Sequence, residues 1–184
     1  PPTEWSEEKN LRWKTPLPGL GHSSPVVWGD LIFLTATVPR GEKLPVPEQP
    51  AGAHNNLDPF HKLRFIVLAV NRASGKIAWQ KIVRTAQPHQ STHESGTWAS
   101  NSPVVDGEHV IASFGSNGIY CLNAKTGEPI WKNNRTEGNT WATPAIVRHS
   151  GKTQVITTAS GKVRSYDLAN GDLIWQCAGL TGNA

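Results

Sequence analysis

Short apolar runs separated by turn residues recur along most of the chain. Between residues 103 and 131 the apolar runs lie at 103–105, 110–114, 119–123 and 128–131. Asp106-Gly107 separates the first two, and an Asp-Gly pair between apolar runs is a strong signal for a β-hairpin. Each run is too short for a helix and is bounded by residues that favour turns. The pattern therefore predicts four short antiparallel strands in this segment.

The same four-strand pattern occurs three times, and each copy ends in Gly-x-x-x-Trp. Each copy also opens on a proline anchor within a Ser-Ser-Pro, Asn-Ser-Pro or Ala-Thr-Pro sequence. We expect the glycine to adopt a positive φ in the turn before the last strand. We expect the tryptophan ring to pack against the next unit, with its N–H reaching a backbone carbonyl. The three pairs are Gly75 and Trp79, Gly127 and Trp131, and Gly171 and Trp175.

Four short antiparallel strands repeated about every 40 to 50 residues are typical of a β-propeller blade. We therefore predict an all-β fold built from propeller blades, because one blade alone leaves both its faces uncovered. The first predicted blade contains a Pro-rich, polar loop insertion at 39–62. The predicted full blades span 21–80, 97–132 and 139–176.

The two ends of the chain carry pieces of the same pattern. Residues 1–20 contain a predicted orphan outer strand that includes Trp13, and residues 177–184 are predicted to begin a further blade. The sequence therefore predicts an incomplete ring of about three full blades plus partial blades at the ends. Open blade faces and unpaired edges favour association, so we expect either a longer natural molecule or self-association.

The composition argues against several classes of protein. The net charge is +4, from 18 basic and 14 acidic residues that are scattered along the chain, so no nucleic-acid-binding patch is predicted. No apolar stretch reaches 18 residues, so no transmembrane span is predicted. The two cysteines, Cys121 and Cys177, are too few for a disulfide scaffold. Two separate thiols are expected, with a disulfide between them as the alternative.

The repeat resembles that of the PQQ-like (quinoprotein alcohol dehydrogenase-like) propeller family. The residues that carry the resemblance are 69–79, 122–131 and 166–175, which match its tryptophan-docking pattern, and the likeness extends over residues 10–178. One branch of that family binds pyrroloquinoline quinone and calcium and oxidises alcohols. The other branch, similar to the outer-membrane assembly lipoprotein BamB, is non-catalytic and includes many uncharacterised secreted bacterial proteins. Residues 92–110 look most like the second branch, which implies a periplasmic or secreted location.

The features that the dehydrogenase branch would require are missing from the sequence. A vicinal cysteine pair is absent, and no acidic cluster has calcium-loop spacing. We therefore predict no catalytic residue, no cofactor and no metal. The alternative to the absence of a metal is a site at His89 and His93, which are four residues apart in a predicted loop between blades. We expect them to be polar loop residues.

Two tryptophans lie just before inner strands, and they are candidates for contact with a ligand or partner. Trp98 and Trp141 are expected either to form a platform at the end of the ring or to pack beneath connecting loops. The leading hypothesis is a non-catalytic scaffold that presents loops and strand edges to a protein partner, including β-strand addition at open edges. The alternative is a fragment of a PQQ-dependent dehydrogenase whose catalytic residues lie outside this chain.

Overall fold

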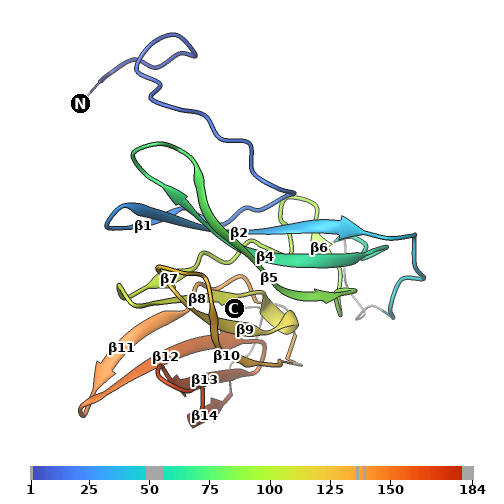
Figure 1. Cartoon of the computed structure of the whole chain (residues 1–184). Helices are drawn as coiled ribbons and strands as arrows, with labels where there is room; N and C mark the ends of the chain where they lie inside the picture. The colour runs from blue at the N-terminus through green and yellow to red at the C-terminus, as the bar shows by residue number, and fades with distance from the viewer. Residues whose placement is uncertain (1, 49–55, 136, 139, 180–184) are drawn as a thin grey trace.

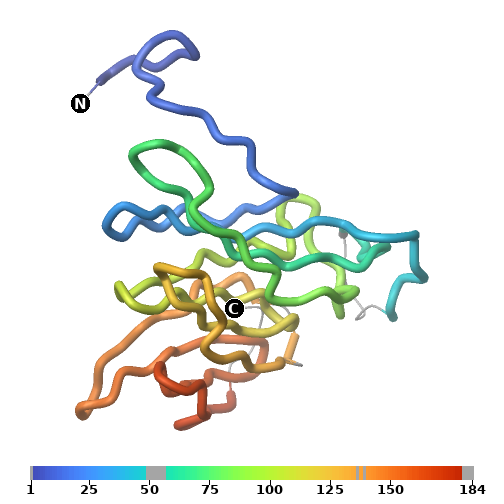
Figure 2. Tube along the Cα trace, in the orientation of Figure 1, coloured from blue at the N-terminus to red at the C-terminus, as the bar shows by residue number. Residues whose placement is uncertain are grey.

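The computed structural model describes residues 2–48, 56–135, 137–138 and 140–179. Three antiparallel four-stranded sheets lie one above another (Figures 1 and 2), and we call them the first, second and third blades. The order of strands in each blade follows the chain, from the inner strand to the outer strand. The predicted all-β fold of propeller blades is therefore confirmed. The first blade comprises β1 (Val26–Trp28), β2 (Leu31–Arg40), β4 (Lys62–Asn71) and β5 (Ile77–Ala86).

The other two blades have shorter strands. The second comprises β7 (Val104–Val105), β8 (His109–Ser113), β9 (Ile119–Asn123) and β10 (Pro129–Asn133), with the short 3₁₀ helix η1 (Gly115–Asn117) between β8 and β9. The third comprises β11 (Ala145–His149), β12 (Lys152–Ala159), β13 (Lys162–Asp167) and β14 (Leu173–Ala178). No helix among the described residues is long and apolar enough to cross a bilayer.

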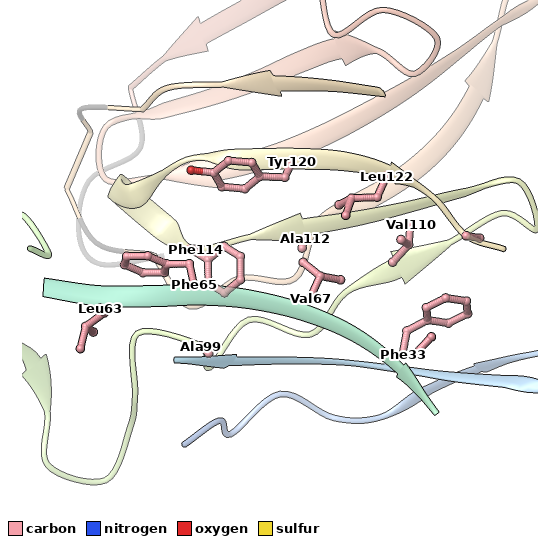
Figure 3. Close-up of a cluster of buried hydrophobic side chains, with 12 residues drawn as sticks. Phe33, Leu63, Phe65, Val67, Ala99, Val110, Ala112, Phe114, Tyr120 and Leu122 are labelled. Carbon is pink, nitrogen blue, oxygen red and sulfur yellow. The ribbon is translucent and has the colours of Figure 1, made fainter. Parts of the chain in front are cut away.

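Apolar side chains from facing sheets fill the space between blades. Between the first and second blades, Phe65 of β4 meets Phe114 edge-to-face, with ring centroids 5.2 Å apart (Figure 3). This cluster also contains Phe33, Val67, Val110, Tyr120 and Leu122. Alternate residues of a strand point to opposite faces of the sheet. The second blade therefore contributes one set of side chains to the first blade and the other set to the third. Ile111, Ile119 and Cys121 accordingly form a second cluster with Val155, Tyr166 and Leu168 of the third blade.

The tryptophans of the repeat join consecutive blades. Trp79, on the outer strand β5, lies against the turn of the second blade at Gly127, and its Nε1 donates to the carbonyl oxygen of Ala124 at 3.0 Å. A Cβ atom on Gly127 would lie 2.6 Å from Cε3 of Trp79. The same contact recurs with Nε1 donors on two other tryptophans: Trp131 packs on Gly171 and donates to Leu168, and Trp13 packs on Gly75 and donates to Arg72.

The three turn glycines have the backbone conformation expected from the sequence. Their φ angles are +72° at Gly75, +73° at Gly127 and +79° at Gly171. Trp79 and Trp131 pack on the next unit, as expected, but the sequence pattern did not reveal that each ring covers the turn glycine of that unit. Glycine is therefore required at each position for two reasons: the turn needs a positive φ, and the indole ring leaves no room for a Cβ atom.

The N-terminal segment differs from its prediction. Among described residues 2–20 there is no strand, so the predicted orphan outer strand is wrong; only an isolated bridge joins Leu20 to Thr37. Trp13 nevertheless docks on the first blade from an irregular segment, helped by Thr15, whose hydroxyl donates to the carbonyl of Gly75. At the other end, Cys177 lies within β14 and not after the last strand as predicted. Residues 180–184 of the predicted further blade lie outside the described residues.

Strands occupy both ends of the predicted loop insertion at 39–62. Strand β2 runs to Arg40, and β4 begins at Lys62 and pairs with it. Residues 49–55 lie outside the described residues. The short strand β3 (Asn56–Leu57) pairs with β6 (Thr92–His93), which precedes the second blade. The insertion is thereby attached to the connection between the first two blades.

Candidate binding site

The segments that lead into the inner strands of the second and third blades meet at one end of the stack. Asn101, in the Asn-Ser-Pro anchor before β7, donates from Nδ2 to the carbonyl oxygens of Thr140 at 3.1 Å and Ala142 at 2.8 Å. Its side chain is buried. This amide therefore holds the segment that precedes the third blade against the segment that precedes the second.

A hollow opens beside this junction. It has an empty volume of about 260 Å³, including the open solvent at its mouth. Its walls come from the two approach segments, from β6 and from the turn containing η1. The lining residues are Thr92, Thr97, Trp98, Asn101, Phe114, Gly115, Asn117, Thr140 and Trp141.

The structure brings the two candidate tryptophans into this one hollow, but they differ in exposure. Trp98 is half-buried, and its Nε1 donates to the carbonyl of Gln90 at 2.8 Å. Trp98 also packs against the cluster between the first and second blades. Trp141 is 41% exposed. Trp98 therefore packs beneath a connecting loop, whereas Trp141 leaves much of its surface available to a ligand.

Two buried polar atoms on the wall of the hollow have no hydrogen-bond partner among the described residues. They are Oγ1 of Thr92 and Oδ1 of Asn117, on residues that are only 3% and 1% exposed. Buried polar atoms normally find a partner within the protein, in ordered water or in a ligand. The backbone at Asn117 is fixed, because its carbonyl accepts a hydrogen bond of 2.9 Å from the hydroxyl of Tyr120. Burial raises the pKa of Tyr120, although Arg84 opposes the rise, so the phenol remains a donor.

A buried ionic cluster supports the segment that carries Trp141. The side chain of Arg135 is 2% exposed, and its Nη2 donates to the carbonyl of Thr158 at 3.2 Å. Glu137 lies between two guanidinium groups, with Oε2 3.5 Å from Nε of Arg135 and Oε1 2.5 Å from Nη2 of Arg164. Arg135 and Glu137 are therefore anchored to the third blade just before the hollow. Sequence reasoning missed this cluster, because Arg164 lies on β13, far along the chain from Arg135 and Glu137.

The two candidate histidines do not share a site. Nε2 of His89 lies 3.4 Å from Nη2 of Arg84, whereas Nδ1 of His93 lies 2.7 Å from the hydroxyl of Ser95. Both are exposed. Within the part of the chain that the structure describes, no three His, Cys, Asp or Glu side chains gather as metal ligands would. The loop and the insertion do meet, however: the hydroxyl of Ser91 donates to Oδ1 of Asp58 at 2.8 Å.

The outer edge of the first blade is a second exposed feature. Strand β5 has ten residues, against five in β10 and six in β14. One edge of β5 pairs with β4, and the other pairs with no strand among the described residues. Two apolar side chains on β5 are exposed, Ile77 at 39% and Ile82 at 45%. This strand therefore offers the longest unpaired outer edge of the three blades.

The stacked four-stranded blades and the tryptophan-docking contacts define a PQQ-like β-propeller. The chain belongs to the family described as outer membrane protein assembly factor BamB, whose profile matches residues 47–140 and 66–182 in two overlapping copies. No curated protein matches the chain.

Two solved structures are similar in fold. One is a europium-containing methanol dehydrogenase, with a TM-score of 0.56 and 16% identity over 92% of this chain and 26% of that one. The other is BamB from Moraxella catarrhalis, with a TM-score of 0.50 and 14% identity over 89% of this chain and 51% of that one. The chain thus spans about half of the BamB chain and about a quarter of the dehydrogenase. At these identities the likeness concerns the fold.

Proposed function

We propose that this chain is a non-catalytic propeller module that binds a protein partner in the bacterial envelope. The observation that carries the proposal is the open edge of β5, which runs for ten residues and bears exposed Ile77 and Ile82. An extended segment of a partner adds to such an edge through main-chain hydrogen bonds, while its side chains contact alternate positions.

The rest of the first blade supports this role. Strands β2 and β4 are also ten residues long and pair over their whole length, so β5 has a rigid support behind it. Natural sheets protect exposed edges with charged residues or proline. On β5, Nζ of Lys81 lies 3.1 Å from Oε1 of Glu128 on the second blade, so this charge does not protect the free edge. The location in the envelope is supported by the family description as an outer membrane assembly factor.

Site-specific crosslinking tests the proposal in the bacterium that makes the protein. A photoreactive residue at exposed Gln80 on β5 is expected to give a discrete protein adduct, which Ile82→Lys abolishes because a charge blocks strand addition. The matched control is Ile130→Lys, which places the same charge at a 43% exposed position on the shorter outer strand β10 and is expected to leave the adduct intact. An absent adduct, or one that survives Ile82→Lys, would overturn the role of this edge.

The dehydrogenase alternative is tested on the purified chain with pyrroloquinoline quinone and Ca²⁺. We expect neither a shift of the quinone absorbance nor alcohol-dependent reduction of a dye. Saturable binding of the quinone would contradict a non-catalytic role, whatever the outcome of the crosslinking experiment.

A further inference from the structure

The strands of the first blade carry positive charge and no negative charge. They contain no Asp or Glu, but five basic residues, which are Arg40, Lys62, Arg64, Lys81 and Arg84. Lys81 forms an ion pair with Glu128 of the second blade. The other four form no ion pair with any described residue. The negative charge that would balance them is therefore missing from the described part of the chain.

Strand pairing brings these charges together beside the second half of β5. Arg40 of β2 lies directly opposite Lys62 of β4, and like charges in that arrangement repel each other. Arg64 of β4 lies opposite Thr85 of β5, so both side chains project from the outer face of the blade. Thr85 is short and exposed. The charge of Arg64 is therefore separated from the free edge of β5 by one small side chain.

Arg84 places a second cation on the other face of the same strand. It lies opposite Phe65, whose ring faces the second blade. Its side chain is half-buried, and its Nη2 lies 3.4 Å from Nε2 of His89. The second half of β5 is therefore flanked by a guanidinium group on each face of the sheet.

A strand that adds to β5 would meet both cations. Neighbouring strands lie about 4.8 Å apart, so the added strand would lie about 10 Å from β4. A glutamate on it and Arg64 are both long enough to meet above Thr85. Successive residues point to opposite faces, so the residue next to that glutamate would lie on the face of Arg84. Farther along, the added strand would pass the exposed side chain of Ile82.

We propose that the segment that adds to β5 carries two consecutive acidic residues, one directed to Arg64 and the other to Arg84, and an apolar residue opposite Ile82. This partner class rests on the proposed strand addition at β5. Charge complementarity of this kind selects the partner, because a basic segment would place like charges side by side. The charge in Ile82→Lys remains unfavourable, since it would face the apolar residue of the partner.

Three fluorescent peptides test this partner class on the purified full chain. Each is as long as β5, which has ten residues, and alternates Val and Thr around a central pair that is Glu-Glu, Gln-Gln or Lys-Lys. Fluorescence anisotropy is expected to show that the Glu-Glu peptide binds about fivefold more tightly than the Gln-Gln peptide, as two partly exposed ion pairs allow. The Lys-Lys peptide is expected to bind most weakly. At about 1 M NaCl the advantage of the Glu-Glu peptide is expected to disappear, because exposed charges are screened.

Variants separate the charge from the shape of the edge. Arg64→Glu is expected to weaken binding of the Glu-Glu peptide about fivefold or more and to leave that of the Gln-Gln peptide unchanged. Arg64→Gln, which removes the charge without reversing it, is expected to act in the same direction by about twofold. The matched control is Arg148→Glu, the same change at an exposed position on β11 of the third blade, which is expected to alter no affinity. Near-ultraviolet circular dichroism checks that each variant is folded.

Each other outcome has a defined meaning. Equal affinities for the Glu-Glu and Gln-Gln peptides would overturn the acidic partner and leave strand addition at β5 intact. Binding of none of the three peptides would count against strand addition itself and so against both proposals. An equal effect of Arg148→Glu would show that only net charge matters, which also overturns the acidic partner. Binding to phosphatidylglycerol vesicles that Arg64→Glu abolishes would assign these cations to a membrane surface instead.

Discussion

At the scale of single residues, the glycine of each Gly-x-x-x-Trp motif is constrained twice. Gly127 has a φ of +73°, a backbone conformation that residues other than glycine adopt at a cost of about 1–2 kcal/mol. It also lies under Trp79, where a Cβ atom would be 2.6 Å from the indole ring. Real packing does not allow that distance, so the ring or the turn must move.

A pair of glycine substitutions separates these two constraints. Gly151 has nearly the same conformation, with a φ of +75°, but nothing lies within 4 Å of its hypothetical Cβ atom. Gly151→Ala is therefore expected to cost only the backbone term, whereas Gly127→Ala adds an overpacking cost of about 1–3 kcal/mol. Urea unfolding of both variants measures the difference in the free energy of unfolding. Equal losses in the two variants would show that the ring of Trp79 yields without cost.

Sequence reasoning succeeds at this scale where the cause is local. The positive φ of Gly75, Gly127 and Gly171 follows from turn chemistry, which three or four neighbouring residues determine. The polar residues of the hollow were not predicted, because Asn101 and Asn117 acquire their roles from carbonyls and voids that distant segments create. Trp98 and Trp141 were named as candidates from their places before the inner strands, but the sequence did not distinguish the half-buried ring from the exposed one.

At the scale of elements, the outer strands β5 and β10 are each coupled to the next blade through one tryptophan. Trp131 of β10 packs on Gly171 and Tyr166 of the third blade, and its Nε1 donates to the carbonyl of Leu168 at 2.7 Å. Trp175 of β14 behaves differently. It is 39% exposed, and its Nε1 donates to Oε1 of Gln154 on its own blade at 3.0 Å. The same sequence motif thus produces a contact between blades at β10 and a contact within a blade at β14.

This contrast predicts unequal effects of removing the two rings. Trp131 is partly buried against the core between the second and third blades, so Trp131→Ala is expected to cost less than the truncation of a fully buried aromatic ring, which costs about 3–5 kcal/mol, but still about 2 kcal/mol or more. Trp175→Ala is expected to cost clearly less, because its ring is partly in water in the native state. Chemical unfolding, followed by far-ultraviolet circular dichroism, measures both. A loss at Trp175 as large as that at Trp131 would contradict the proposed difference between the docked and undocked rings.

The elements themselves were predicted closely wherever turns marked their ends. The predicted strand at 110–114 is found as His109–Ser113, and the strand at 119–123 has the bounds Ile119–Asn123. The long strands of the first blade were not predicted, because a Pro-rich insertion reads as a loop. Pro39 is tolerated near the end of β2, where it pairs with Leu63. The segment at Trp13 forms no strand, since no strand lies beside it among the described residues.

At the scale of the whole molecule, stability depends on the faces between blades and not on isolated sheets. The two cysteines allow the separation of the blades to be measured, because one is buried between blades and the other is exposed. Both are free thiols; Cys121 is fully buried between the second and third blades, and Cys177 is exposed on β14. The expectation of two separate thiols holds in the structure. Burial, with a smaller contribution from the negative charge of Asp106, raises the pKa of Cys121 to about 12.

These positions predict two very different rates of alkylation. Only the thiolate reacts, so at pH 8 a thiol with a pKa of about 12 is reactive in about one molecule in ten thousand, even before access is considered. Intact mass after iodoacetamide treatment is expected to show one rapid modification, at Cys177, and a second only as urea opens the stack. In a Cys177→Ser variant, the urea dependence of labelling at Cys121 is expected to follow that of global unfolding, because Cys121 becomes accessible only when the second and third blades separate. Labelling of Cys121 well below the unfolding midpoint would instead show that the third blade detaches on its own, and that the blades are joined less cooperatively than their shared core implies.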